Sequence, residues 1–319
     1  MKTISKIILL ATTMILFSCE DILEEDITND TIQTVSPIEK DTISSNVVNF
    51  QWNIIKGATN YRVQVFNENL AVVLDSLVGN KVSLTHPFLP GTYKWRVRGE
   101  NAGYQSVYSF PVGFTVVQSN DLTNQQVVLS NPISGLYTNS TSLICTWQDL
   151  IPADYYELEL VNVTAGQTII LQQSNITSTS VTLNNANLAQ DAEYLWKIKA
   201  VNATSQSVFS NRNFFIDRVN PNQPQNSLPA NNSTQTVNQP IAFTWTMPSD
   251  AGTIQSQINY TIEFSNTTTF ATILQTSTSA TTMIQQSFAN AGDYYWRVKA
   301  VDAASNVSTY STAFKFTIN

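Results

Sequence analysis

The chain has little charge, and most of its excess acid lies near one end. Only 12% of its 319 residues are Asp, Glu, Lys or Arg, compared with about 25% in ordinary soluble proteins. Eight carboxylates and one lysine lie between Cys19 and Asp41, whereas 15 acids and 13 bases follow. Because this remainder is nearly neutral and has no Lys/Arg cluster, it lacks the basic face that binding to phosphates requires. Nucleic acid is therefore not an expected partner.

Groups that commonly carry catalysis are equally scarce. There is one histidine, His86, which we expect in a loop because Pro87 follows it. No nucleophile elbow, phosphate-binding glycine loop, Cys-x-x-Cys pair or calcium-loop spacing occurs. Carboxylates that could hydrolyse glycosides, such as Glu157 and Glu159, alternate with apolar residues and are expected on a solvated strand face. We therefore predict no catalytic residue, no metal site and no cofactor, and a hydrolase is the least favoured function.

The chain has only two cysteines, and they predict different roles. Cys145 alternates with Trp147, so it should face the same buried side as an unreactive core thiol. Cys19 follows an apolar run over 7–17, which is about half the length that spans a bilayer and indicates an export signal. The sequence Leu-Phe-Ser-Cys ending at Cys19 resembles a bacterial lipobox, which implies removal of residues 1–18 and acylation of Cys19. Several acyl chains on one residue would anchor the chain stably. A plain secretory signal is the alternative.

The six tryptophans form three pairs that repeat about every hundred residues. The first members of the pairs are 95 and 98 residues apart, and the second members are 101 and 100 residues apart. We therefore predict one unit repeated three times, over 36–118, 119–218 and 219–319, behind a tether at 19–35. The pairs are Trp52 with Trp95, Trp147 with Trp196, and Trp245 with Trp296.

Each tryptophan lies in a segment with the period of a half-buried strand. Apolar residues stand at the first tryptophan of each pair and two and four residues before it, the alternation expected when one sheet face is buried. Further alternating strands begin at Tyr61, Tyr156 and Tyr260, and final strands are predicted over 109–116, 210–216 and 311–318. No window outside the signal segment has a sustained helical period. The predicted fold class is all-β.

These strands together resemble fibronectin type III modules in their bacterial surface-protein form, which are antiparallel immunoglobulin-like β-sandwiches of seven strands. In that family a tyrosine at the start of the penultimate strand forms a tyrosine corner, preceded by a leucine. Leu89 and Tyr93 match this pattern, whereas repeats two and three have a different spacing and leave the corner open. The resemblance implies three tandem sandwiches. It says little about function, because this fold hosts many unrelated activities.

The acidic stretch behind Cys19 resembles the export signals of surface lipoproteins in Bacteroidota. That resemblance implies a lipid-anchored protein of the outer membrane that is exposed on the cell surface; a solvated, disordered tether is the alternative. Short Asp-Ser/Thr-aliphatic motifs match sites that are O-glycosylated in that phylum. The candidate residues are Thr31, Thr42 and Ser76.

Candidate binding residues lie where the repeats differ. The third repeat has six extra residues between Trp245 and Tyr260, and this insertion contains the candidate binding residues Asp250, Ile254 and Gln255. Tyr104 has no aromatic counterpart and is a candidate for stacking on a sugar or peptide, whereas Tyr108 has counterparts and is predicted to be core.

We predict a non-enzymatic, surface-anchored protein that acts in binding or adhesion, or as a spacer. Its membrane contact would be the lipid, and its partner a glycan or another surface protein. The alternative is a glycan-capture subunit of an outer-membrane polysaccharide importer. Such a subunit would need exposed stacking residues, and the repeat assigns all six tryptophans to the core.

Overall fold

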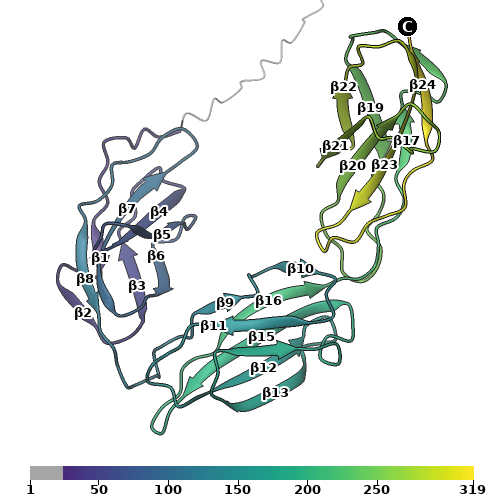
Figure 1. Cartoon of the computed structure of the whole chain (residues 1–319). Helices are drawn as coiled ribbons and strands as arrows, with labels where there is room; N and C mark the ends of the chain where they lie inside the picture. The colour runs from purple at the N-terminus through teal and green to yellow at the C-terminus, as the bar shows by residue number, and fades with distance from the viewer. Residues whose placement is uncertain (1–23) are drawn as a thin grey trace, which may run out of the picture. The chain divides into compact units, whose positions relative to one another are not determined.

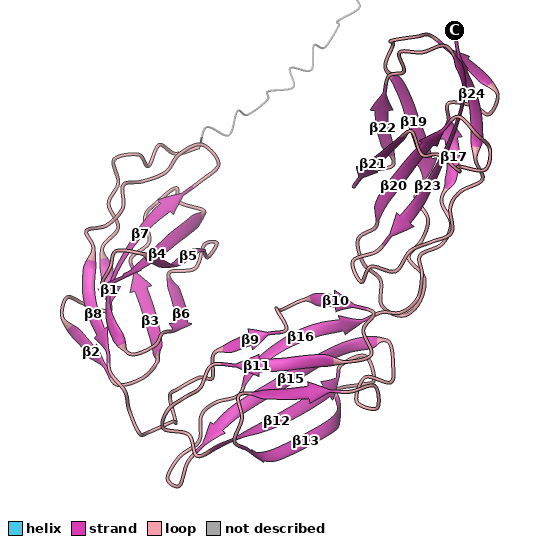
Figure 2. Ribbon diagram, in the orientation of Figure 1, coloured by secondary structure: helices cyan, strands magenta, loops and turns pink. Residues whose placement is uncertain are grey.

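A computed structural model of the protein describes residues 24–319 (Figure 1). This part of the chain consists of strands and loops (Figure 2), and it includes no helix that is long and apolar enough to cross a membrane. The predicted signal peptide and the predicted lipidation site, Cys19, lie outside the described residues. One compact unit contains the described residues through Ser44 together with Val48–Val117, and a second contains Ser45–Val47 and Gln118–Asn319.

The first unit holds one β-sandwich, built from a three-stranded and a five-stranded sheet. The strand orders are β1-β3-β6 and β2-β8-β7-β4-β5. The strands are β1 Thr34–Ser36, β2 Asp41–Ile43, β3 Val47–Trp52, β4 Asn60–Asn67, β5 Val72–Leu77, β6 Ser83–Pro87, β7 Gly91–Glu100 and β8 Val112–Val116.

The second unit holds two more sandwiches with the same pairing. In the second sandwich the orders are β14-β11-β9 and β10-β16-β15-β12-β13, and in the third they are β17-β19-β22 and β18-β24-β23-β20-β21. The strands of the second are β9 Leu129–Asn131, β10 Leu136–Thr138, β11 Leu143–Trp147, β12 Tyr155–Asn162, β13 Thr168–Ile176, β14 Ser180–Leu183, β15 Ala192–Val201 and β16 Ser210–Ile216. Those of the third are β17 Gln225–Leu228, β18 Ser233–Gln235, β19 Ile241–Thr246, β20 Asn259–Ser265, β21 Gln275–Ser279, β22 Met283–Gln286, β23 Gly292–Val301 and β24 Phe314–Ile318. The predicted fold class, three tandem fibronectin type III-like sandwiches, is confirmed.

The first strand of each sandwich is divided between its two sheets. In the first sandwich β1 pairs antiparallel with β3, whereas β2 pairs parallel with β8. Pro37 lies between them, and because proline has no N–H to donate, no ladder hydrogen bond is lost where the chain changes sheets. Pro132 and Pro229 occupy the same place in the other sandwiches. Each sandwich therefore has eight strands rather than the predicted seven.

The predicted tryptophan cores are confirmed. All six indoles are at most 4% exposed, and Trp95, Trp196 and Trp296 are fully buried. The residues two positions before the first tryptophan of each pair, Phe50, Cys145 and Phe243, are also fully buried. Each sandwich encloses a separate apolar cluster built around its own pair. Because aromatic side chains bury large areas, these pairs dominate the stability of each sandwich.

A tyrosine corner is present in all three sandwiches. Tyr93 Oη donates to the carbonyl of Leu89 at 2.8 Å, and Tyr194 Oη donates to that of Gln190 at 2.8 Å. Tyr294 Oη donates to the carbonyl of Asn290 at 3.0 Å. The acceptor is a backbone carbonyl four residues upstream in each case, so the interaction does not depend on the side chain there. The altered leucine spacing in repeats two and three therefore leaves the corner intact.

The first sandwich begins earlier than the predicted residue 36. Strand β1 starts at Thr34, and Ile32 belongs to the core at 2% exposure. Ile27 is fully buried, and Glu25 Oε1 lies 3.0 Å from Lys56 Nζ. The predicted tether over 19–35 is therefore wrong for residues 24–35, because Ile27 and Ile32 are buried and the first strand already begins in this stretch.

Two of the predicted final strands begin three residues later than expected. Strand β8 starts at Val112 and β24 at Phe314. Just before β8, Ser109 Oγ accepts from the N–H of Val97 at 3.1 Å, and Ser109 N donates to the Val97 carbonyl at 2.8 Å. Ser311 makes the same pair of bonds to Val298. A serine hydroxyl thus replaces a ladder carbonyl and satisfies the buried N–H of the neighbouring strand.

Candidate functional site

The first sandwich carries two exposed aromatic side chains in the connection between β7 and β8. Tyr104 is 40% exposed, as predicted for a stacking residue, and its N–H donates to Asn101 Oδ1 at 2.7 Å. Phe110 is 87% exposed, the highest value among the large apolar residues of the described chain. Phe110 was missed because residues 109–116 were predicted as a strand. Pro111 was the available signal, since a proline cannot donate within a ladder.

The insertion of the third sandwich turns two of its three candidate residues inward. It connects β19 and β20, and Gln255 is exposed as predicted. Asp250 and Ile254, however, are each only 8% exposed. Asp250 Oδ2 accepts from the N–H of Ser256 at 2.7 Å, which folds the loop back on itself. Asp250 and Ile254 are therefore not placed to contact a macromolecular partner, contrary to prediction.

Three further residues have defined surroundings. His86 lies in β6 rather than in a loop; its ring centroid is 5.0 Å from that of Phe88, and burial lowers the pKa of His86. Tyr108 was predicted to be core but is only half-buried. Its ring lies against the guanidinium of Arg96, whose central carbon is 4.0 Å from the ring centroid. Cys145 is a buried free thiol, as expected for a core cysteine, and burial raises its pKa to about 12.

The candidate glycosylation residues differ in exposure. Thr31 and Thr42 are exposed, whereas Ser76 is half-buried in β5. A glycosyltransferase needs its acceptor hydroxyl accessible. The two threonines meet that requirement better than the serine, and modification of any of the three stays a prediction.

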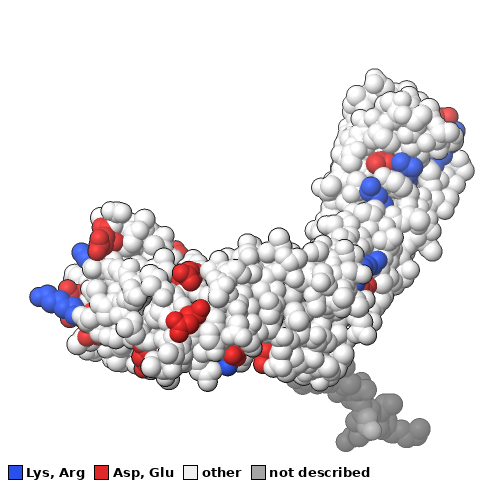
Figure 3. Space-filling view, turned by 60° about the horizontal axis from the view of Figure 1, so that its bottom comes forward, with Lys and Arg blue, Asp and Glu red and all other residues white. Residues whose placement is uncertain are grey.

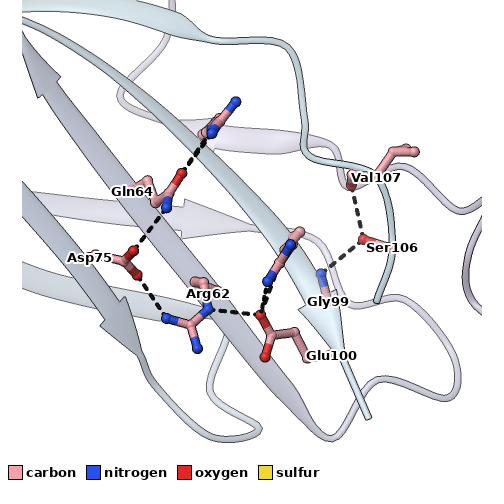
Figure 4. Close-up of polar contacts among 9 residues, drawn as sticks. Arg62, Gln64, Asp75, Gly99, Glu100, Ser106 and Val107 are labelled. Carbon is pink, nitrogen blue, oxygen red and sulfur yellow. Dashed lines mark hydrogen bonds and ion pairs between the residues drawn. The ribbon is translucent and has the colours of Figure 1, made fainter. Parts of the chain in front are cut away.

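The outer face of the first five-stranded sheet carries a chain of paired charges (Figure 4). Arg62 contacts Asp75 at 2.9 Å and Glu100 at 2.8 Å, while Gln64 Nε2 donates to Asp75 at 2.8 Å. Burial opposes ionisation of Glu100, but hydrogen bonds from Arg62 and Arg98 outweigh it and lower the pKa of Glu100. Because these groups are partly exposed, each pair contributes only about 0–1 kcal/mol. The charged side chains of this face pair with one another, so we assign them a structural role.

The same device occurs on the other two sandwiches, where a basic side chain pairs with a glutamate and lies near an aromatic ring. Lys199 contacts Glu157 at 3.0 Å and Lys197 contacts Glu159 at 3.5 Å. In the third sandwich Arg297 contacts Glu263 at 2.7 Å and lies 3.7 Å from the ring centroid of Tyr310. Cation–π contacts of this kind stabilise exposed sites by about 0.5–1 kcal/mol. Glu157 and Glu159 are thus engaged by lysines.

On the face of the molecule drawn in Figure 3, charged side chains are few and both signs occur in small groups. This agrees with the low charge content of the sequence. The group of like charges that stands out is buried, and it lies in the third sandwich.

In each sandwich three segments meet at a place that we call the three-segment junction. They are the lead-in to the first strand, the connection after the first-tryptophan strand, and the connection after the second-tryptophan strand. In the first sandwich Asn101 Nδ2 donates to the carbonyls of Glu25 at 2.8 Å and Gly57 at 2.9 Å. One neutral side-chain amide, the amide bridge, therefore ties the three segments together.

The second sandwich has the same amide bridge. Asn202 Nδ2 donates to the carbonyls of Asn120 at 2.9 Å and Pro152 at 3.1 Å. Asn101 and Asn202 each stand six residues after the second tryptophan, and their acceptors also occupy matching positions. Gly57 and Pro152 stand five residues after the first tryptophan. Glu25 and Asn120 stand twelve residues before the proline that divides the first strand.

In the third sandwich all three of these positions are aspartates. Asp217 stands twelve residues before Pro229, Asp250 five after Trp245, and Asp302 six after Trp296. We call these three residues the aspartate cluster. Each offers a carboxylate oxygen, and the three oxygens lie within 4.8 Å of one another. The side chains are 0%, 8% and 4% exposed, so the cluster is buried.

Asn306 takes over only part of the bridging role. Its Nδ2 donates to the Asp217 carbonyl at 2.9 Å and to Asp302 Oδ2 at 2.8 Å. Its N–H donates to Asp302 Oδ1 at 2.8 Å, and Val219 N–H donates to Asp217 Oδ1 at 3.1 Å. Asp217 Oδ2 and Asp250 Oδ1 are buried without a hydrogen-bond partner. The three segments thus meet without a donor for these two oxygens.

No basic side chain neutralises the aspartate cluster within residues 24–319. The ion pairs of this part of the chain do not include Asp217, Asp250 or Asp302. The neighbouring Arg218 is committed to Asp191 at 2.7 Å. Burial, together with the negative charges of Asp302 and Asp250, raises the pKa of Asp217 to about 6. The hydrogen bond from Val219 acts in the opposite direction.

The sequence analysis predicted no metal site, and the aspartate cluster is the group of described residues that could hold one. Its members are 33 and 52 residues apart, so no short ligand motif signals them. Alignment of the three repeats was the available signal. It places all three aspartates at the positions of the amide bridge.

The comparisons with known proteins assign neither a family nor a function. No protein-family model and no curated protein matches the sequence. Among solved structures, the FN1-FN3 domains of chicken CNTN1 are similar, with 15% identity and a TM-score of 0.40 over 90% of this chain and 96% of that chain. A likeness this distant carries no argument. The fold assignment rests on the sheets themselves: the chain is a tandem of three fibronectin type III-like sandwiches.

Proposed function

We propose that the protein is a non-enzymatic, surface-anchored lipoprotein whose sandwiches act as a modular binding or spacer array. The observation that carries this proposal is that each sandwich has a separate apolar core and buries both of its tryptophans in it. The charged side chains of the sheet faces are largely paired with one another. Exposed loop residues such as Tyr104 and Phe110 are left for recognition.

The anchor in this proposal is lipid on Cys19, held in the outer membrane with the sandwiches on the cell surface. Only residues 20–24 separate Cys19 from Glu25, whose carbonyl is held by Asn101 at 2.8 Å. A lipidated Cys19 would therefore keep the first sandwich close to the membrane.

Fractionation of cells that express the Cys19→Ser variant tests the anchor. The wild type should sediment with the outer membrane, be released by detergent and be cleaved by protease added to intact cells. The variant should appear in the soluble fraction. If the variant stays in the membrane fraction, the anchor assignment is wrong.

A glycan is the partner class that the exposed aromatics favour. Aromatic rings provide the rigid apolar faces on which sugars stack, and Tyr104 and Phe110 occupy one connection of the first sandwich. This is also the observation that supports the second candidate function, glycan capture for an importer. The burial of all six tryptophans argues against an extended stacking surface.

Glycan arrays and affinity gels separate binding from a spacer role. Glycan binding should be lost in the Tyr104→Ala and Phe110→Ala variants and retained in a Met247→Ala control, which removes a 72% exposed apolar side chain from the third sandwich. Binding that survives both first-sandwich variants would place the site elsewhere. Absence of binding to every glycan would favour the spacer role or a protein partner.

A further inference from the structure

The aspartate cluster combines two independent observations that point to a cationic ligand. Three carboxylates, each at least nine-tenths buried, lie within 4.8 Å of one another without a basic partner. Separately, Asp217 Oδ2 and Asp250 Oδ1 have no hydrogen-bond donor. An ionised carboxylate is costly to bury unless it is paired or coordinates a metal. The cluster therefore lacks a compensating positive charge among its protein neighbours.

The other two sandwiches show what this position requires. There, one side-chain amide donates to both neighbouring segments, so the three-segment junction is held by an electropositive group at its centre. In the third sandwich Asp302 replaces that asparagine and cannot donate. Asn306 reaches Asp217 and Asp302, but no hydrogen bond from it reaches Asp250. A cation bound to all three carboxylates would supply the link to Asp250 that Asn306 does not make.

We propose that Asp217, Asp250 and Asp302 bind one calcium ion, which takes the place of the amide bridge in the third sandwich. Calcium takes oxygen ligands, including carboxylates, at about 2.3–2.6 Å. The three carboxylate oxygens all lie within 4.8 Å of one another, so one ion at these ligand distances can contact all of them. Magnesium demands near-ideal octahedral geometry, keeps several waters and is seldom held by protein ligands alone. Zinc prefers nitrogen and sulfur ligands, which the cluster does not offer.

Such an ion would hold the start of the third sandwich. Asp217 directly follows β16, and its N–H donates to the Thr138 carbonyl of the second sandwich at 3.1 Å. Asp250 and Asp302 belong to loops of the third sandwich. Calcium would thus clamp the point at which the chain passes from one sandwich into the next, which goes beyond the binding or spacer role proposed above.

Calorimetric titration of the whole protein with calcium chloride, after treatment with EDTA and dialysis, tests this proposal. We expect one site with a Kd between about 1 µM and 1 mM, the range of calcium sensors and extracellular modules. Magnesium chloride should bind at least about tenfold more weakly. At calcium concentrations about 100-fold above Kd, the Tm of the third sandwich should rise by on the order of 10 °C.

Three variants locate the site. Asp302→Asn carries the residue of the other two sandwiches, so it should fold while its calcium affinity falls about tenfold or more. Asp250→Asn should lose affinity as well and gives a second test should Asp302→Asn not fold, as judged by circular dichroism. The control is Asp293→Asn, which removes an exposed carboxylate of the same sandwich that pairs with Lys315 at 2.8 Å. It should bind calcium like the wild type.

Two outcomes would overturn the proposal. One is a wild type that binds no calcium in the millimolar range and melts identically in calcium and EDTA; the buried carboxylates would then be compensated by a shared proton. The other is binding that is unchanged in Asp302→Asn and Asp250→Asn, which would place the ion on other carboxylates.

Discussion

In the second sandwich Asn202 donates from one amide to two backbone carbonyls, whereas the third sandwich has a carboxylate, Asp302, at the matching position. The two sandwiches share strand order, a buried tryptophan pair and a tyrosine corner. The difference is therefore local. It lies at the three-segment junction, where a neutral and self-sufficient bridge in one sandwich corresponds to an uncompensated group of acids in the other.

In our proposal, a repeated scaffold acquires a ligand-dependent element without a new sequence motif. Aspartates at three positions that the fold brings together, one of them within the six-residue insertion, replace a hydrogen-bonded bridge with a set of proposed oxygen ligands. The scaffold supplies the geometry, and the side chains decide whether the junction is held by the protein alone or with an ion.

The largest expected effect tests the claim that the two cores are equivalent. Trp196→Ala and Trp296→Ala should each destabilise their own sandwich by about 3–5 kcal/mol, because each removes a fully buried indole and leaves a cavity. Urea unfolding followed by tryptophan fluorescence measures both. A cost in the third sandwich far below that in the second would show that the difference between them is not confined to the junction.

Asn202→Asp places the third sandwich's residue in the second. The carboxylate cannot donate to the carbonyls of Asn120 and Pro152, so the second sandwich should lose about 1–3 kcal/mol of unfolding free energy. Calcium should not restore this loss, because the matching positions bring no further acids. Urea titration with calcium and with EDTA provides the measurement. Full rescue by calcium would show that a single carboxylate suffices.

The tyrosine corners should behave alike in both sandwiches. Tyr194→Phe and Tyr294→Phe each remove one hydrogen bond to a backbone carbonyl, and each should cost about 0.5–1.5 kcal/mol. The comparison uses the same urea titration. Costs that differ between the two variants by more than about 1 kcal/mol would contradict the equivalence of the corners.

For the last prediction we expect no change: calcium should not alter the reactivity of the Cys145 thiol. In a Cys19→Ser background Cys145 is the only thiol, and its burial and raised pKa make it unreactive until the second sandwich opens. Calcium should leave its labelling rate by a disulfide reagent unchanged, because Cys145 belongs to the core of the second sandwich alone. Labelling that calcium slows several-fold would show that the second and third sandwiches unfold together.

Much of the fold could be predicted because it depends on period and spacing. The alternation around each tryptophan placed β3, β11 and β19 within one residue of their observed starts and ends. The boundary at residue 36 failed because Ile27 and Ile32 lie in an acidic stretch, where charge outweighed two isolated apolar residues in the prediction. Their burial depends on a surface that forms only when the sandwich folds.

The candidate site was less predictable, for a related reason. Asp250 was singled out as part of an exposed insertion, but its side chain is buried because the insertion folds back through Ser256. The link between Asp250 and Asp217 or Asp302 is not local in the sequence. It follows from the repeat, since positions that meet in one sandwich meet in the next, and from the structure, which shows what Asn101 and Asn202 do at those positions.

The most direct test of the central claim is a two-dimensional amide NMR spectrum of the labelled protein, recorded with EDTA and then with calcium. A calcium site in the aspartate cluster predicts shifts of the amide signals of Asp217, Asp250, Asp302 and their loop neighbours. The signals around Asn202, at the matching junction of the second sandwich, should not move. Spectra that are identical with and without calcium, or shifts spread over exposed carboxylates of all three sandwiches, would contradict the account.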